Sequence, residues 1–98
     1  MAAEKFVEEK IQGDKVVLFS KSTCPYCDQA KDLFTSLGYK YTAYELDTMP
    51  NCSDIQDYLK EKTGARTVPR VFIGGKCIGG ASDTKQLHNA GKLKALLE

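Results

Sequence analysis

The chain has 98 residues, of which 42% are hydrophobic and 28% are charged, and its 14 basic residues nearly balance its 13 acidic ones. This composition excludes a disordered chain, and the length suits one folding unit, so we expect a single domain over residues 1–98. The net charge of +1 gives no reason to expect nucleic acid as a partner.

No stretch of the sequence approaches the roughly 20 apolar residues that cross a membrane. The N-terminal segment mixes acidic and apolar side chains and lacks the continuous apolar region of a secretory signal. We therefore expect a soluble, cytoplasmic protein without membrane contacts. An organelle transit peptide removed earlier stays an open alternative.

The first half of the chain predicts helix, strand, helix and strand. Apolar residues at helical spacing end at Gly13, and the apolar run Val16–Phe19 is typical of a central strand that is covered on both faces. A second helical pattern begins at the Cys24-Pro25-Tyr26-Cys27 motif and ends at Gly38. Tyr39–Leu46 is rich in aromatic residues at period two and predicts the second strand.

The second half predicts a helix, a hairpin and a final helical region. Ser53 and Gln56 form a capping-box pattern at the start of a helix that ends near Gly64. Gly74-Gly75 predicts a two-residue hairpin turn, and Asp83 is placed to cap the last helical region. The two hairpin strands, and the glycine at which we expect the last helix to break, are Arg70–Ile73, Lys76–Ile78 and Gly91.

This order of elements constrains the fold. The first two strands are joined by a helical crossover and should be parallel, whereas the hairpin strands are antiparallel. A four-stranded mixed sheet with helices on both faces satisfies both constraints. A CxxC motif beside a βαβ pattern is typical of a thioredoxin-like fold, so we expect this α/β fold class.

The four cysteines allow several interpretations. A secreted chain of this size would use them as a disulfide scaffold, but the absence of a signal favours reduced thiols. A structural zinc site needs two closely spaced ligand pairs, whereas only Cys24 and Cys27 are close, and His88 is the single histidine. We expect no metal.

The motif itself predicts an activated thiol. If Pro25 takes the first helical position, Cys24 is the N-cap, and its sulfur faces the free N–H groups of Tyr26 and Cys27. These donors and the positive end of the helix stabilise a sulfur anion. Lys21 is a candidate for an additional nearby cation, although an exposed lysine in a loop also serves as a plain solubilising charge.

The two motif cysteines have different predicted roles. Cys27 lies on the apolar stripe of the helix, so we expect it to be more buried than Cys24 and to have a higher pKa. Cys24 would attack a substrate sulfur, and Cys27 would resolve the mixed disulfide. The alternative is that both are inert core cysteines. For Cys77 we expect packing in a hairpin strand, and for Cys52 a loop position open to adventitious oxidation.

Three segments together carry a family resemblance. The Cys24-Pro25-Tyr26-Cys27 motif, Thr67-Val68-Pro69 and Gly79-Gly80 followed by Ser82-Asp83 occur in the same order as in the dithiol glutaredoxins, glutathione-dependent members of the thioredoxin superfamily. The sequence resembles that family over essentially its whole length. The resemblance implies a glutathione-disulfide oxidoreductase that reduces glutathione mixed disulfides and protein disulfides.

The resemblance also implies a site for glutathione as co-substrate. In the family, the residue at Pro69 is cis, the backbone at Val68 pairs with the cysteinyl part of glutathione, and Tyr26 flanks the bound sulfur. Thr67 belongs to the same segment.

The same resemblance implies which side chains bind the two ends of glutathione. Lys21 and Gln56 would reach the glycine carboxylate, and Arg66 would add positive charge there. Ser82 and Asp83 would receive the γ-glutamyl end, although Asp83 also has the simpler role of a helix cap.

The expected partners are glutathione and glutathionylated or disulfide-containing proteins, and we expect a monomer. Ala81 departs from many relatives, which have cysteine there, so a regulatory disulfide at that position is not available. One alternative function is a dimeric iron–sulfur cluster carrier with bound glutathione, against which Pro25 counts. Another is a thioredoxin-type reductase independent of glutathione, against which Gln56, Arg66 and Asp83 count.

Overall fold

The computed structural model describes residues 2–98 and confirms the predicted α/β architecture; Met1, where the predicted domain begins, lies outside the described residues. The strands are β1 (Val16–Ser20), β2 (Thr42–Glu45), β3 (Arg70–Ile73) and β4 (Lys76–Gly79). Their order in the sheet is β2-β1-β3-β4. As predicted, β1 runs parallel to β2, and β3 is antiparallel to β4.

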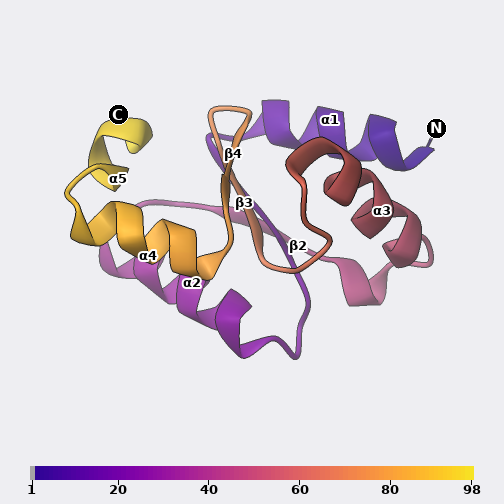
Figure 1. Ribbon diagram of the computed structural model, residues 1–98, viewed down its shortest axis with the longest axis horizontal. Helices are drawn as coiled ribbons and strands as arrows, with labels where there is room; N and C mark the ends of the chain where they lie inside the picture. Colours follow the sequence, from indigo (N-terminus) through magenta and orange to yellow (C-terminus); the bar gives the residue numbers. More distant parts are fainter. Residues whose placement is uncertain (1) are drawn as a thin grey trace.

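Helices cover both faces of this sheet (Figure 1). Helices α1 (Ala2–Gly13) and α3 (Cys52–Thr63) pack together on one face. Helices α2 (Pro25–Ser36) and α4 (Ala81–Asn89) pack together on the other face, where α5 (Leu93–Leu97) follows. None of the helices in residues 2–98 is both long enough and apolar enough to span a bilayer.

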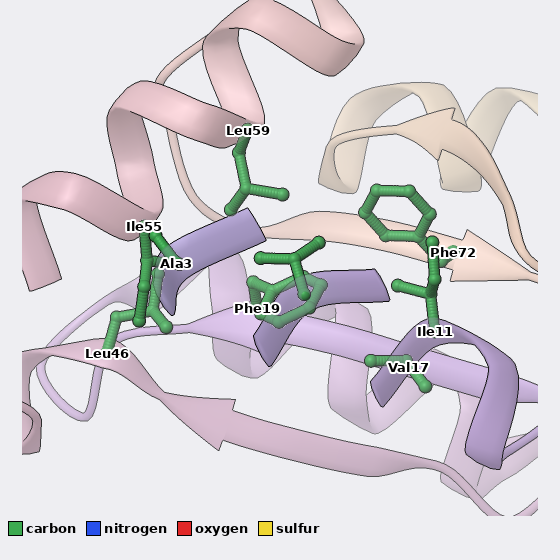
Figure 2. Packing of buried hydrophobic residues seen from close by; sticks show 9 residues of the cluster. Ala3, Ile11, Val17, Phe19, Leu46, Ile55, Leu59 and Phe72 are labelled. Atoms are coloured by element: carbon green, nitrogen blue, oxygen red, sulfur yellow. The ribbon is translucent and has the colours of Figure 1, made fainter. Parts of the chain in front are cut away.

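Strand β1 is the centre of the core, and all five of its residues are buried. Val17 and Phe19 face α1 and α3, where the Phe19 ring meets Phe72 edge-on with ring centroids 5.7 Å apart (Figure 2). Val16 and Leu18 face the layer of α2 and α5. Because both faces of β1 need apolar side chains, its sequence has no polar alternation, as the central position predicts.

The second strand is shorter than Tyr39–Leu46. Its hydrogen-bonded part is Thr42–Glu45, because the backbone N–H of Tyr39 donates to the carbonyl of Phe34 at 3.0 Å and so terminates α2. At the other end, the buried Leu46 begins a 3₁₀ turn, η1 (Leu46–Thr48).

The predicted capping box at the start of α3 is wrong. The N-cap is Asn51, and Ser53 is the second residue of the helix instead of its N-cap. Gln56 is buried, and its Nε2 donates to the backbone carbonyl of Arg66 at 3.1 Å. Cys52 is the first residue of this helix, not part of a loop. The predicted end is confirmed, since Gly64 has the left-handed conformation that terminates helices.

The start of α4 also differs from the prediction. Gly80 is the N-cap, and Asp83 is the third helical residue, where its Oδ2 accepts a hydrogen bond from the Gly80 N–H at 2.9 Å. Asp83 therefore caps the helix from inside its first turn. The break at Gly91 is confirmed, because α4 ends before it and α5 begins after it.

Candidate active site

The Cys24-Pro25-Tyr26-Cys27 motif lies where the central strand passes into α2. Pro25 is the first helical residue and Cys24 is the N-cap, as predicted. The Cys27 N–H donates to Cys24 Sγ at 3.2 Å, the only hydrogen bond from a motif N–H to this sulfur in residues 2–98, although Tyr26 was expected to contribute as well. The half-buried Cys24 sulfur thus lies at the positive end of the helix.

Cys27 is fully buried, whereas Cys24 is partly accessible. Burial raises the pKa of the Cys27 thiol to about 11, and the hydrogen bond with Cys24 acts in the same direction. Hydrogen bonds with the Ser20 hydroxyl and the Lys21 backbone partly offset this rise. The predicted difference in burial is confirmed, and burial moves the pKa of Cys27 in the predicted direction.

A cis peptide bond joins Val68 to Pro69, opposite the motif. The Cys24 thiol donates to the Val68 carbonyl at 3.8 Å. This contact spans 44 residues of sequence and brings the motif and the Thr67-Val68-Pro69 segment to one site. Pro69 is buried beneath the site, and Thr67 is exposed beside it.

Gln56, which is buried in α3, contacts Arg66 in the segment that leads to the cis peptide bond. The Gln56 side chain holds the Arg66 carbonyl, while the Arg66 guanidinium is exposed. Arg66 Nε forms an ion pair with Asp57 at 2.8 Å, and its Nη2 donates to Ser53 Oγ at 3.0 Å. The guanidinium is therefore held along α3, with its charge paired to the Asp57 carboxylate.

The start of α4 approaches the same segment from the hairpin side. A side chain at Gly80 would lie 3.4 Å from the Pro69 carbonyl oxygen, so the N-cap of α4 is next to the cis bond. Ser82 and Asp83 are exposed in the first turn of this helix. Backbone N–H groups at a helix N-terminus suit an anionic ligand.

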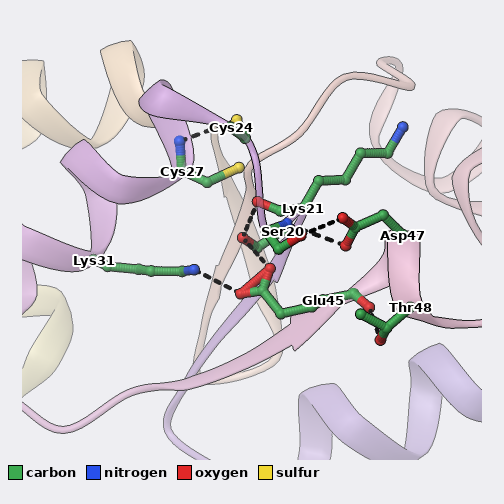
Figure 3. A network of polar contacts seen from close by, with 9 residues as sticks. Ser20, Lys21, Cys24, Cys27, Lys31, Glu45, Asp47 and Thr48 are labelled. Atoms are coloured by element: carbon green, nitrogen blue, oxygen red, sulfur yellow. Dashed lines mark hydrogen bonds and ion pairs between the residues drawn. The ribbon is translucent and has the colours of Figure 1, made fainter.

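Two predicted residues make little contact with the others. Tyr26, within the motif, is 65% exposed. The Lys21 backbone carbonyl accepts the Cys24 N–H at 3.2 Å. Its ammonium points away from both sulfur atoms (Figure 3). The proposed role of Lys21 as a nearby cation stays a prediction.

Sequence reasoning missed a polar network below the motif. Ser20 is completely buried, and its hydroxyl donates to Glu45 Oε2 at 3.0 Å. Glu45 Oε1 forms an ion pair with Lys31 at 2.6 Å (Figure 3). A serine that ends an apolar strand was the only available signal, since Glu45 and Lys31 become neighbours only through the pairing of β1 with β2 and the packing of α2.

Comparison with known proteins gives one consistent result. Residues 16–78 match the family model described as Glutaredoxin. Glutaredoxin-1 of Bos taurus is 48% identical over 98% of this chain and 93% of its own length. Glutaredoxin-C2 of Arabidopsis thaliana is 52% identical, with coverage of 99% and 86%. The crystal structure of a buckwheat glutaredoxin-glutathione complex has a TM-score of 0.96 at 42% identity, with coverage of 98% and 87%.

The fold, the position of the cysteine pair and these similarities agree. A family model that spans residues 16–78 includes the motif, the cis-proline segment and most of the hairpin. The chain therefore belongs to the glutaredoxin family of glutathione-dependent thiol-disulfide oxidoreductases.

Proposed function

We propose that Cys24 is the nucleophile and Cys27 the resolving thiol in the reduction of glutathione mixed disulfides and protein disulfides. One observation carries this assignment: the accessible Cys24 sulfur accepts the Cys27 N–H at the start of α2, while the Cys27 sulfur is buried with a raised pKa. A hydrogen bond donor and a helix N-terminus stabilise a thiolate at the first position, and burial keeps the second thiol protonated.

The reaction follows from these two states. The Cys24 thiolate attacks a glutathionylated protein thiol, a Cys24–glutathione disulfide forms, and the protein thiolate leaves with the electron pair of the broken S–S bond. A second glutathione then attacks the glutathione sulfur of that mixed disulfide, which releases Cys24 as a thiolate and yields oxidised glutathione. For a protein disulfide, Cys27 instead attacks Cys24 and releases the fully reduced protein.

We propose that the cis-proline segment holds the middle of glutathione. The Val68 backbone lies within reach of the Cys24 sulfur and would pair with the cysteinyl residue in the manner of an added strand. Thr67 and Pro69 flank this backbone, and Tyr26 would cover the bound sulfur. A similar protein from buckwheat has been crystallised as a glutathione complex, which supports this part of the proposal.

The two ends of glutathione would meet opposite sides of the site. Gln56, Arg66 and Lys21 supply amide and cationic groups for the glycine carboxylate. Ser82 and Asp83 begin α4, where backbone N–H groups suit the γ-glutamyl carboxylate and the Asp83 carboxylate suits the ammonium group.

We also propose that the protein acts as a monomer in the cytoplasm. All four cysteines are free thiols, a state that a reducing compartment maintains. The iron–sulfur carrier is not proposed, because no feature of the described residues favours it over the thiol reaction.

The experiment is turnover of a small glutathione mixed disulfide and of a protein disulfide, with glutathione and glutathione reductase as the electron source. Cys27→Ser should retain the first activity and lose most of the second, while Cys24→Ser should lose both. Cys77→Ala, which removes a thiol that packs against the core, is the matched control. Retention of the first activity by Cys24→Ser would contradict the assignment.

A further inference from the structure

The Cys27 sulfur lies next to a network of polar contacts that joins Ser20 to Glu45 and Glu45 to Lys31. Figure 3 shows Cys27 Sγ pointing from α2 toward the end of β1, where the Ser20 hydroxyl lies. Ser20 is 0% exposed, and Glu45 lies behind it on the neighbouring strand. Lys31, one helical turn after Cys27, forms an ion pair with Glu45 and is the last member of the network.

The Ser20 hydroxyl has a single hydrogen, and several acceptors compete for it. Its acceptors are Glu45 Oε2 at 3.0 Å and the Lys21 carbonyl at 3.4 Å. The nearer acceptor is also the charged one, so Glu45 holds the hydrogen in the reduced protein. With the hydrogen on Glu45, Ser20 offers no donor to a thiolate at Cys27.

A thiolate at Cys27 would reverse this preference. Rotation about the Ser20 Cβ–Oγ bond moves the hydrogen from Glu45 to the sulfur without displacement of any heavy atom. A hydrogen bond from the Ser20 hydroxyl lowers the pKa of Cys27, against the larger effect of burial. How easily the hydrogen leaves Glu45 depends on the negative charge there, and Lys31 offsets that charge.

We propose that Ser20, Glu45 and Lys31 are positioning residues that set how readily Cys27 becomes the attacking thiolate in the resolving step. This inference rests on the proposed role of Cys27. Glu45 opposes ionisation by holding the Ser20 hydrogen and by its own charge, whereas Lys31 favours ionisation by neutralising Glu45. The network therefore tunes the reduction of protein disulfides, which needs both cysteines.

The attack of Cys27 on the mixed disulfide transfers no proton to the network. Cys27 attacks Cys24 Sγ in the mixed disulfide, the Cys24–Cys27 bond forms, and the bond from Cys24 to the substrate sulfur breaks. The electron pair and the former Cys27 proton both end on the departing substrate thiol. Ser20 donates a hydrogen bond during the attack and keeps its own proton throughout.

Other charged groups near the network act on it weakly. Burial opposes the charge on Lys31, but Glu45 more than offsets this and holds the Lys31 pKa above its usual value. Asp28 and Tyr41 also raise it. On the β1 side, the Lys21 ammonium points away from Cys27 (Figure 3). The remaining titratable neighbour of Cys27 is the Cys24 sulfur, which is uncharged once it forms the mixed disulfide.

The test measures the resolving step alone. The Cys24–glutathione mixed disulfide of the full chain is prepared, and formation of the Cys24–Cys27 disulfide is followed by acid quench and mass spectrometry across a pH series. Lys31→Met should move the pH profile upward and Glu45→Gln should move it downward, each by about one unit, or about tenfold in rate at fixed pH. Ser20→Ala should slow the step.

Two control variants make the same charge changes on exposed positions away from the network. Lys60→Met in α3 and Glu9→Gln in α1 should stay within a factor of about two of the unmodified protein, since solvent and salt screen exposed charges. Opposite shifts from Lys31→Met and Glu45→Gln support the network. Shifts of the same sign, or shifts no larger than those of the controls, overturn it.

The Cys27→Ser variant separates the role of Cys27 from the role of the network. If Cys27→Ser reduces protein disulfides as fast as the unmodified protein, Cys27 is not the resolving thiol, and the network cannot act through it. If Cys27→Ser loses that reaction while Lys31→Met and Glu45→Gln keep the original pH profile, only the network is wrong. Because Glu45→Gln is isosteric, it keeps the test decisive even where Lys31→Met fails to fold.

Discussion

The backbone N–H of Cys27 donates to the Sγ of Cys24 at 3.2 Å, so the residue that carries the resolving thiol also stabilises the attacking sulfur. This relationship depends on the backbone of Cys27 and not on its side chain. Replacement of the Cys27 side chain therefore leaves the donor in place, which is why Cys27→Ser can retain the reaction that needs Cys24 alone. The Cys27 sulfur of the unmodified protein, in contrast, is buried and closed off from solvent.

The raised pKa of Cys27 predicts a protonated thiol at neutral pH. With a pKa of about 11, its thiolate fraction rises only in strongly alkaline solution. Iodoacetamide at pH 7, followed by peptide mass spectrometry, should leave Cys27 unmodified in the folded protein and modify it after denaturation. Modification of Cys27 in the folded protein at pH 7 would contradict the buried, protonated state.

The same raised pKa predicts a loss of stability at alkaline pH. The unfolded chain releases the Cys27 proton near the ordinary pKa of 9.0, whereas the folded protein retains it to about 11. The stabilising contribution is thus complete below the unfolded value and disappears as the pH rises through the folded one. Urea unfolding between pH 8 and 11 should show a smaller decline for Cys27→Ala than for the unmodified protein, and an equal decline would refute this linkage.

Gln56 should matter far more than Ser53, although the sequence pattern treats them as a pair. Gln56→Met removes the side-chain donor to the Arg66 carbonyl, so it should lower the free energy of unfolding by about 1–2 kcal/mol. It should also raise the KM for glutathione. Ser53→Ala removes only an exposed contact with Arg66 and should cost less than about 0.5 kcal/mol. Denaturant unfolding tests this contrast, since a true capping box would make Ser53→Ala cost about 1 kcal/mol.

Local patterns made most of the fold predictable. The unbroken apolar run of Val16–Phe19 indicated a central strand, and Gly74-Gly75 indicated the hairpin because both glycines need the positive φ angles that the structure gives them. The helix start at the cysteine motif followed from Pro25 and from the helical pattern of apolar residues after it. These features depend on neighbours in sequence, which is why sequence reasoning reached them.

What the sequence did not reveal depends on contacts between distant segments. Ser53 and Gln56 have the spacing of a capping box, yet Gln56 is buried and donates to the Arg66 carbonyl instead of capping the helix. The contact of Ser20 with Glu45 spans 25 residues and exists only because β1 pairs with β2. No local pattern records such a pairing, so the network below Cys27 required the structure.

Tyr58 and Lys62 of α3 bind the Glu8 carboxylate of α1, so part of the free energy of unfolding should be lost in acid. Hydrogen bonds from Lys62 and then from Tyr58 hold the pKa of Glu8 below its usual value. That contribution is present above the unfolded pKa of Glu8 and is lost as the pH falls through the folded one. Tyr58→Phe should lower the free energy of unfolding by about 1 kcal/mol at pH 7 and by less at pH 3. A cost that stays the same at both values would mean that the Glu8 carboxylate is not involved.

Gly79 should be the least replaceable glycine near the site. Its φ of +112° disfavours any side chain, and a Cβ there would lie 2.2 Å from Asp83 Oδ2. Gly38 is the matched control, because its φ is also positive, at +77°, but nothing lies within 4 Å of an added Cβ. Gly38→Ala should therefore cost only the backbone strain of about 1–2 kcal/mol. Gly79→Ala should cost more in thermal unfolding and should also raise the KM for glutathione, because it displaces the carboxylate that caps α4. Equal costs for the two variants, with an unchanged KM, would show that the start of α4 does not depend on this close approach.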